Sequence, residues 1–313
     1  MTGMIFPSGD LNVDRRAGFA ESMAYLGDLD AAIEVLAEAL EQAPDWAAGW
    51  FRLGEYHERA GDMTGAVSCW QKALAADPAD PFGASLKCDL GGQGSVVEQM
   101  PAAFVETLFD QYAPRFDASL VEGLSYRGPQ EIMAELGTFR MGRVLDLGCG
   151  TGLMGAELRG QADWLEGWDL STRMLAEAEG KAIYDALDKR DIAALDLGGT
   201  RWDVIVAADV FAYVGALERV VGWCAGSLAP GGRLVFSVEL SEAEPVVLRE
   251  SRRFAHSRAY IAGLLAQAGF GEVALRQVVL RMDRGQPIQS LVVMASGLGV
   301  GRREGEGEAE AFA

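Results

Sequence analysis

The chain has 313 residues, 50% of them hydrophobic and 23% charged, which is enough for about two domains and at least one sizeable core. Its 46 acidic and 27 basic residues give a formal charge of -19, a field that repels nucleic acids and anionic membranes. Four scattered cysteines without a CxxC pair, and only two histidines, argue against a zinc site or a disulfide framework. Without a membrane span or a secretory signal, the sequence predicts a cytoplasmic protein.

An internal repeat occupies the first part of the chain. Residues 13–46 align with residues 47–80 at an offset of 34, which superposes the Gly-Asp turns and the final prolines of the two copies. The second copy carries the sharper pattern of large and small residues, namely Trp50, Leu53, Gly54, Ala66, Trp70, Ala73 and Leu74. This pattern resembles the tetratricopeptide repeat, a pair of antiparallel helices. We expect repeats with a capping helix over residues 13–90 and a linker at 91–100.

The role of these repeats is left open by the sequence. Repeats of this kind usually bind a peptide or protein in their concave face, and a bracing role against the next domain or in a dimer is the alternative. Residues 1–80 hold five basic and fourteen acidic side chains, which would suit a basic partner. The sequence does not indicate an oligomeric state.

The clearest functional signal is a short apolar strand that runs into a glycine-rich turn and a helix. It reads Arg143-Val-Leu-Asp-Leu-Gly-Cys-Gly-Thr-Gly-Leu-Met-Gly155. Gly148, Gly150 and Gly152 place no side chains in the turn, so backbone N–H groups can approach a ligand closely. The same letters match the dinucleotide pattern GxGxxG, which by itself is a weak signal.

Three acidic residues argue for a ligand other than a dinucleotide. Asp146 precedes the first glycine, where a carboxylate would repel a pyrophosphate and attract an amino group. Asp169 ends a second strand, 21 residues beyond Gly148, as needed for hydrogen bonds to ribose hydroxyls. Asp191 follows the next crossover and could accept a hydrogen bond from an adenine amino group. A ligand with an amino group, a ribose and an adenine but no phosphate fits all three.

Four motifs in order resemble the class I S-adenosylmethionine-dependent methyltransferases, over roughly residues 101–297. They are the VLDLGCGTG stretch and the segments at 170–178, 202–211 and 228–236. The resemblance implies an enzyme that uses S-adenosyl-L-methionine as its cofactor and needs no metal. The cofactor-binding residues that we predict are Tyr112, Asp146, Gly148, Cys149, Gly150, Thr151, Gly152, Asp169, Leu170, Met174, Asp191, Ile192 and Asp209.

A finer resemblance lies upstream of the glycine turn. Residues 109–117 and 124–129 are similar to the helical entrance of small-molecule methyltransferases of the ubiquinone-biosynthesis type. Together with the repeats, this entrance resembles a bacterial group of predicted tetratricopeptide-containing methyltransferases. The resemblance implies a small-molecule acceptor. The alternatives are a protein or peptide acceptor recruited by the repeats, and a non-catalytic scaffold that works through them.

Apolar strands alternate with amphipathic helices after residue 140. The pattern predicts an α/β, Rossmann-like fold whose parallel, doubly wound sheet binds ligands at the carboxyl ends of its strands. A helix should begin at Ser257 and end near Gly269, and a final hairpin should complete seven strands. Residues 298–313 are expected to be a disordered acidic tail. The strands that we expect lie at 143–147, 164–168, 189–193, 203–208, 232–239, 272–282 and 288–295.

Candidate groups on the acceptor side are Tyr112, Tyr126, Tyr213 and His256, of which Tyr213 and His256 are the catalytic candidates. Methyl transfer from a sulfonium is an in-line displacement, so a hydroxyl acceptor needs a general base, whereas an ionised carboxylate or thiolate does not. His256 has the pKa of a base, or simply precedes a helix capped by Ser257. Tyr213 either touches the acceptor or is an aromatic lid. Asp209 either contacts the ligands or caps a helix.

Overall fold

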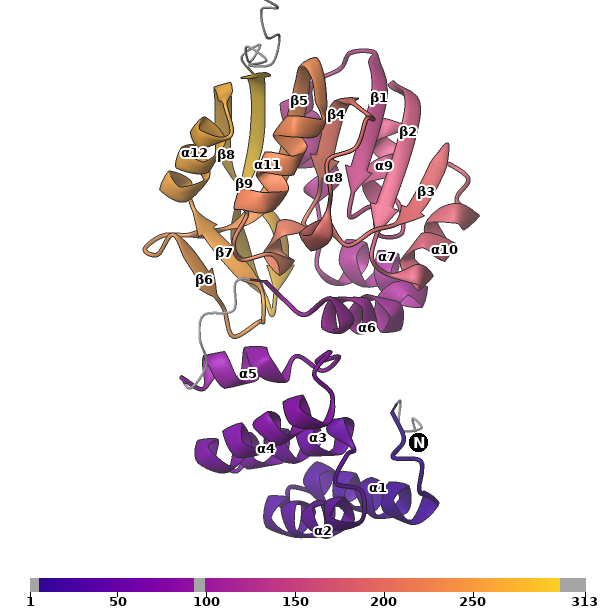
Figure 1. The fold of residues 1–313 in the computed structure, drawn as a ribbon, viewed down its shortest axis with the longest axis vertical. Helices are drawn as coiled ribbons and strands as arrows, with labels where there is room; N and C mark the ends of the chain where they lie inside the picture. The colour runs from indigo at the N-terminus through magenta and orange to yellow at the C-terminus, as the bar shows by residue number, and fades with distance from the viewer. Residues whose placement is uncertain (1–5, 93–98, 299–313) are drawn as a thin grey trace, which may run out of the picture.

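The computed structural model describes residues 6–92 and 99–298, and it has a helical part followed by an α/β part (Figure 1). The expected linker falls mostly, and the expected tail almost entirely, outside the described residues. The first part consists of two helical hairpins and a shorter helix, as the repeat predicts. Its helices are α1 (Leu11–Leu26), α2 (Leu29–Gln42), α3 (Ala47–Arg59), α4 (Met63–Ala76) and α5 (Ala84–Leu90).

Local sequence explains where the repeat helices begin and how closely they pack. The carboxylates of Asp28 and Asp62 accept backbone N–H groups at the starts of α2 and α4, which is the usual role of an N-cap. A Cβ atom at Gly54 would lie 2.3 Å from the indole nitrogen of the fully buried Trp70, so only glycine allows α3 and α4 to approach this closely. The predicted pairing of small and large residues is confirmed.

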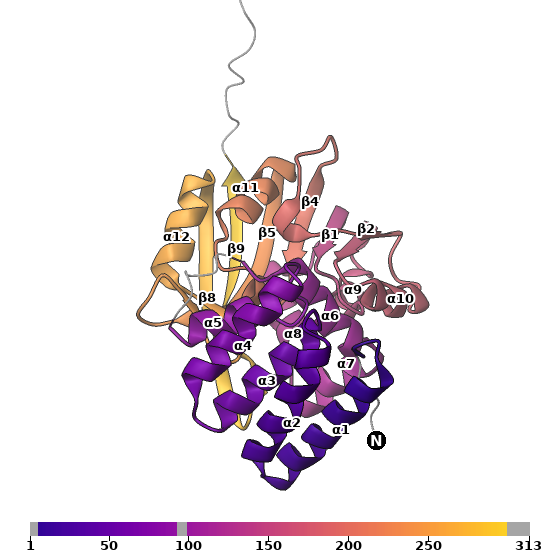
Figure 2. The same ribbon diagram turned by 60° about the horizontal axis from the view of Figure 1, so that its bottom comes forward.

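A group of short helices connects the repeats to the sheet. Ser171 Oγ donates to Asp110 of α6 at 2.6 Å, and Lys181 donates to Asp117 at 2.6 Å, so these helices are tied to both ends of the helix at Thr172–Gly180. Figures 1 and 2 show α6 between the repeats and the ends of the strands. The connecting helices are α6 (Ala102–Tyr112), η1 (Ala113–Arg115), α7 (Phe116–Ala118), η2 (Ser119–Gly123) and α8 (Gly128–Leu136).

The second part is built around one sheet in the order β3-β2-β1-β4-β5-β7-β6, with β9 pairing antiparallel to both β5 and β8. Strands β1 to β5 are parallel, so their carboxyl ends meet at one edge. The strands are β1 (Met141–Leu147), β2 (Ala162–Asp169), β3 (Ala186–Lys189), β4 (Trp202–Ala207), β5 (Leu228–Ser241), β6 (Val246–Leu248), β7 (Phe254–Ser257), β8 (Phe270–Asp283) and β9 (Gln286–Leu298).

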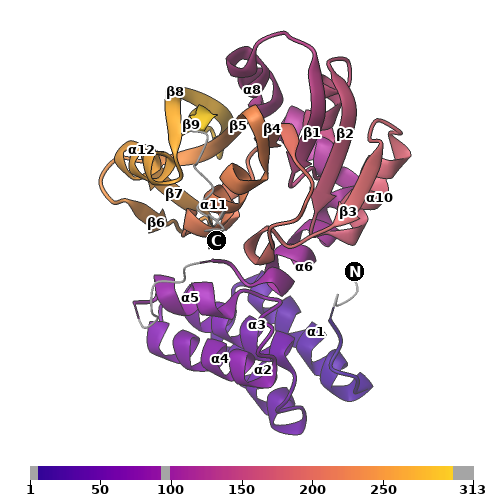
Figure 3. The same cartoon turned by 45° about the horizontal axis from the view of Figure 1, so that its top comes forward.

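Helices flank this sheet on both faces (Figure 3). They are α9 (Leu153–Leu158), α10 (Thr172–Gly180), α11 (Glu218–Ser227) and α12 (Arg258–Gln267), with the short turns η3 (Ile192–Ala194) and η4 (Phe211–Tyr213). The predicted Rossmann-like sheet preceded by an all-helical part is therefore confirmed. The final hairpin forms as expected, and its turn residues Arg284 and Gly285 both have positive φ, 48° and 77°, the geometry that tight hairpins favour.

Two details of the sheet differ from the expectation. The strand predicted at 189–193 already ends at Lys189, because the N–H of Arg190 donates to the carbonyl of Asp169 and Asp191 then caps η3. Within the described residues the sheet has nine strands rather than seven, since the hairpin of β6 and β7 is added beside β5. That hairpin is short, and its three- and four-residue strands carry too little periodicity to be recognised from sequence.

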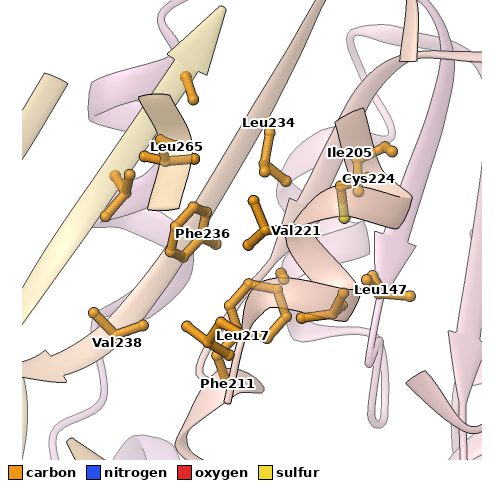
Figure 4. Packing of buried hydrophobic residues seen from close by; sticks show 14 of the residues in the cluster. Leu147, Ile205, Phe211, Leu217, Val221, Cys224, Leu234, Phe236, Val238 and Leu265 are labelled. Atoms are coloured by element: carbon orange, nitrogen blue, oxygen red, sulfur yellow. The ribbon is translucent and has the colours of Figure 1, made fainter. Parts of the chain in front are cut away.

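Buried apolar side chains fill both faces of the sheet. Figure 4 shows the larger cluster, in which Leu147, Phe211 and Phe236 pack under α11 and α12. A smaller cluster links the two parts of the chain, and we call it the joint. It consists of Leu86 of α5, Met100, Phe104 of α6 and Phe254 of β7, all at most 5% exposed. Helix α5 therefore packs against the β6–β7 hairpin, as Figures 1 and 3 also show.

Candidate functional site

Three cavities meet where the carboxyl ends of the parallel strands face α6 and η2, and Phe109 and Tyr213 line all three. The strand-end cavity, of about 80 Å³, is lined by Gly148, Asp169, Leu170, Asp191, Ile192 and Asp209 among others. The turn cavity, of about 90 Å³, is lined by residues that include Gly148, Cys149, Gly150, Tyr126, Asp209 and Arg253. The aromatic cavity, of about 230 Å³, is lined by residues that include Phe104, Phe109, Tyr112, Phe116, Arg252 and Arg253.

The glycine turn has the geometry that its sequence requires. Gly148 has a φ of 73°, and a Cβ atom there would lie 2.4 Å from Val210 Cγ2, so a larger residue would be both strained and crowded. The N–H of Gly150 donates to Asp169 Oδ2 at 2.8 Å, which ties the turn to the end of β2. Cys149 is buried in the turn, and burial raises the pKa of its thiol well above the usual value, as suits a packing residue.

Two of the predicted carboxylates come together in the strand-end cavity. Asp169 accepts the N–H of Ser171 at 2.8 Å as well as that of Gly150, while Asp191 accepts the N–H of Ala193 at 2.9 Å. Burial raises the pKa of Asp169, and its partners are backbone groups rather than a lysine or arginine. Both carboxylates thus stand beside a cavity with lone pairs still able to accept hydrogen bonds.

Other residues of the predicted cofactor set lie behind the cavity walls. Asp146 is fully buried, accepts the Tyr184 hydroxyl at 2.6 Å, and is absent from the linings given above. Burial raises its pKa to about 7, and its Oδ1 atom has no partner among the described residues. Met174 is fully buried in α10, and Thr151 donates its hydroxyl to Asp117 of α7. These side chains support the turn from behind.

Asp209, at the end of β4, is held by two arginines. Arg253 donates to its Oδ1 at 2.8 Å, and Arg281 donates to Oδ1 and Oδ2 at 2.9 and 2.7 Å. Burial by itself would raise the pKa of Asp209, but the two guanidinium groups outweigh it and hold that pKa below its usual value. The short helix that follows, at Phe211–Tyr213, has no side-chain cap among the described residues, and the Asp209 carboxylate is in ion pairs with the two arginines rather than in a capping hydrogen bond.

A second carboxylate extends this network. Glu239 of β5 is 2% exposed and accepts Arg249 at 3.0 Å, Arg253 Nε at 2.7 Å, and Arg281. We call Arg249, Arg253 and Arg281 with Asp209 and Glu239 the arginine cluster. Three guanidinium groups face two carboxylates, which leaves one positive charge in excess. Arg249 and Arg253 come from the turn of the β6–β7 hairpin, where the N–H of Arg249 donates to the carbonyl of Arg253.

The candidate acceptor-side residues are only partly brought together. The Tyr213 hydroxyl accepts Arg253 Nη1 at 2.6 Å, and burial raises the pKa of this tyrosine, so it remains a phenol. Tyr126 lines the turn cavity, and Tyr112, 46% exposed, lies at the rim of the aromatic cavity.

His256 lies apart from the three cavities. It is fully buried in β7, its Nε2 donates to the carbonyl of Gly215 at 2.8 Å, and burial lowers its pKa. It is not among the residues that line the three cavities. His256 instead precedes a helix capped by Ser257, whose side chain accepts the N–H of Tyr260 at the start of α12.

Sequence reasoning missed the arginine cluster. Asp209 lies 44 residues from Arg253 and 72 from Arg281, and Glu239 lies 42 from Arg281, so no local motif joins the cluster. Two signals were present. Arg281 interrupts an apolar stretch of β8, and three arginines fall within residues 249–253.

A parallel sheet with a glycine turn after its first strand and carboxylates at the next strand ends defines a Rossmann-like ligand-binding domain. The family model for the methyltransferase domain matches residues 116–273, and the chain belongs to this family. A tetratricopeptide repeat model matches residues 19–81. Each part therefore matches a model of the kind of domain that its motifs resemble.

Curated relatives agree with this assignment. The chain is 30% identical to a malonyl-[acyl-carrier protein] O-methyltransferase of Enterobacter lignolyticus over 45% of this chain and 55% of the relative. It is 32% identical to a ubiquinone biosynthesis O-methyltransferase of Burkholderia cenocepacia over 30% of this chain and 43% of the relative. The chain thus spans about half the length of the curated relatives it matches.

One chain of the solved complex that contains the Haloferax volcanii Trm112 methyltransferase activator superposes with a TM-score of 0.50 at 19% identity. The superposition covers 60% of this chain and 96% of the solved chain. This likeness concerns the fold alone. Within the described residues, no helix combines the length and hydropathy that a membrane span requires.

Proposed function

We propose that the protein is an S-adenosylmethionine-dependent methyltransferase that transfers a methyl group in line to an oxygen of a small molecule. The observation that carries the proposal is the glycine turn joined to Asp169, beside a cavity that Asp191 also lines. The named activities of the curated O-methyltransferase relatives support the same class of reaction. The free, buried cysteines at all four cysteine positions are consistent with a reducing, cytoplasmic location.

The residues of the strand-end cavity fit this cofactor. Asp169 and Asp191 would accept hydrogen bonds from the ribose hydroxyls and the adenine amino group, while Leu170 and Ile192 provide apolar walls for the adenine. Gly148 keeps the floor of both the strand-end and the turn cavity free of side chains. Asp169 has no cationic partner within the described residues, as suits a ligand with positive charge. When bound, the cofactor supplies an electrophilic methyl group on a sulfonium.

Residues of the chain enclose and align the reactants. Phe109 and Tyr213 stand edge to face with ring centroids 5.1 Å apart, where all three cavities meet, and they shield this point from water. Arg253 and Arg281 hold Asp209 fixed at the end of β4. Such fixed walls can keep a nucleophile and the methyl group aligned, which is the main requirement of an in-line transfer.

The size and position of the aromatic cavity favour a small acceptor over a peptide. The cavity has a volume of about 230 Å³. Its walls come from the α/β part, from α6 and from the segments that connect α6 to α8, and none of its described lining residues belongs to α1 to α5. The repeats contribute to the joint, where Leu86 packs on Phe104 and Phe254, and Glu58 and Lys87 line a separate cavity of about 930 Å³ that borders the arginine cluster. We therefore assign the repeats a bracing role, and a protein bound elsewhere on them remains compatible with it.

Calorimetry with S-adenosylhomocysteine tests the cofactor site. Asp169→Ala removes the carboxylate that binds Gly150 and faces the cavity, so its affinity for S-adenosylhomocysteine should fall at least about tenfold, or about 1.4 kcal/mol. Asp163→Ala is the matched control, because Asp163 lies on the same strand at its exposed opposite end. An unchanged affinity in Asp169→Ala would contradict the assignment of the site.

A further inference from the structure

The aromatic cavity has an unusual combination of walls. Phe104, Phe109 and Phe116, with leucines at 108, 120 and 124, give it an apolar lining. Its charged residues are Arg252 and Arg253, and no carboxylate of the described chain lines it. In a protein with a formal charge of -19, a cavity with cationic groups and no acidic ones is a local reversal of sign.

Arg253 also has binding capacity to spare. Its guanidinium group has five N–H donors, and three of them hold Glu239, Tyr213 and Asp209 at 2.6 to 2.8 Å. Two donors are left without a partner among the described residues. Arg252, at the same cavity, forms no ion pair within the described residues, so the site can accept an anion without creating an unpaired buried charge.

The catalytic candidates Tyr213 and His256, and Asp209 beside them, are not suited to act as a general base. Asp209 is neutralised by Arg253 and Arg281, Tyr213 accepts a hydrogen bond from a guanidinium, and His256 lies away from the cavities. These residues therefore offer no general base to an acceptor that must lose a proton, whereas an acceptor that is already ionised needs no base. A carboxylate meets this condition and matches the planar donors of arginine.

We propose that the methyl acceptor is an amphipathic carboxylic acid, whose ionised carboxylate binds Arg253 while its apolar body lies against Phe104, Phe109 and Phe116. This inference rests on the proposed function and names its substrate class. A lone pair of the carboxylate oxygen forms the new O–CH₃ bond, and the electron pair of the broken C–S bond stays on sulfur. The products are a neutral methyl ester and a neutral thioether, and no proton moves.

Binding to the full chain saturated with S-adenosylhomocysteine tests the carboxylate site without turnover. We expect calorimetry to show that octanoate binds at least tenfold more tightly than octanamide and octanol, which share its apolar body. Equal or weaker binding of octanoate would overturn the proposal, provided that S-adenosylhomocysteine binds. Failure to bind S-adenosylhomocysteine itself would instead contradict the proposed function, so the two failures are distinguishable.

Variants assign the preference to Arg253. Arg253→Gln should abolish the tenfold preference for octanoate, and Arg252→Gln, at the same cavity, should reduce it less. Arg140→Gln removes the same charge from an exposed pair with Asp163 and should leave the preference unchanged. Retained affinity for S-adenosylhomocysteine shows that each variant is folded. If Arg253→Gln is not folded, the wild-type series with Arg252→Gln decides, and an unchanged preference in a folded Arg253→Gln overturns the assignment.

Transfer of a labelled methyl group identifies the acceptor atom. With labelled S-adenosylmethionine, label on octanoate that alkali releases as methanol would support ester formation. Label on catechol or octanol with none on octanoate would overturn the proposal. If none of these compounds is methylated, the binding comparison of octanoate with octanamide and octanol decides whether the proposal stands.

Discussion

The strand-end cavity and the aromatic cavity, which we call the two sides of the cleft, have opposite electrostatic character. On the side of the strand-end cavity, burial raises the pKa values of Asp146 and Asp169, and their partners are a phenol and backbone N–H groups. On the side of the aromatic cavity, the charged lining residues are Arg252 and Arg253, with no carboxylate of the described chain beside them. The first side is therefore suited to a cationic ligand and the second to an anionic one, which is the charge pairing that a sulfonium and a carboxylate would present.

The largest effect should come from breaking the arginine cluster. Asp209→Asn leaves Arg253 and Arg281 without their shared carboxylate, and removal of one partner from a buried ion pair costs about 3–5 kcal/mol. Urea unfolding would measure this loss. Asp169→Asn, on the opposite side, should cost about 1 kcal/mol or less, since it loses only hydrogen-bond strength. Equal losses in the two variants would remove the contrast between the sides.

The joint should affect one side of the cleft more than the other. Leu86→Ala creates a cavity next to Phe254, and such truncations cost about 2–5 kcal/mol of unfolding free energy. Because Phe254 follows Arg253, the variant should weaken octanoate binding and preserve binding of S-adenosylhomocysteine. Leu26→Ala, at an 82% exposed position of α1, is the control and should change stability by less than about 0.5 kcal/mol. A parallel loss of both ligands would show that the joint supports the whole cleft.

A smaller effect, dependent on pH, should come from Asp146. Its pKa is 3.8 in the unfolded chain and about 7 in the folded protein, so between these values the folded state binds more protons. Stability should therefore fall as pH rises, by about 1.4 kcal/mol per pH unit, over the range from about pH 5 to about pH 6.5. Asp146→Asn cannot ionise, and its unfolding free energy should lack this contribution. Parallel pH profiles for the wild type and the variant would refute the raised pKa.

The smallest effect is expected at Tyr213. Tyr213→Phe keeps the ring between the cavities and removes one hydrogen bond to Arg253, a change of about 0.5–1.5 kcal/mol. Octanoate should bind correspondingly less tightly, with binding of S-adenosylhomocysteine unchanged. Tyr25→Phe, at a 90% exposed position, provides the control for loss of a hydroxyl. A loss of more than about a hundredfold, or about 2.7 kcal/mol, would instead indicate that the phenol contacts the bound carboxylate directly.

The same contrast explains what the sequence could predict. The strand-end side is encoded in short segments, because a glycine turn and the residue that ends the next strand identify Gly148 and Asp169 without knowledge of distant contacts. The repeat helices and the final hairpin were predictable for the same reason. The other side depends on Asp209 meeting Arg281, 72 residues away, and on a hairpin too short to show a pattern. His256 illustrates the limit, since its chemistry suggested a base and its burial in β7 removes it from the cleft.

The net charge of -19 has a consequence for the rate at which an acid reaches the arginine cluster. At low ionic strength the protein's overall field repels an approaching anion, while the excess charge near Arg253 attracts it only at short range. Salt screens the long-range repulsion over about 10 Å at 0.1 M, whereas contacts inside the cavity are screened much less. For the proposed acid, the association rate constant should therefore rise with moderate salt, the opposite of the usual behaviour of oppositely charged partners.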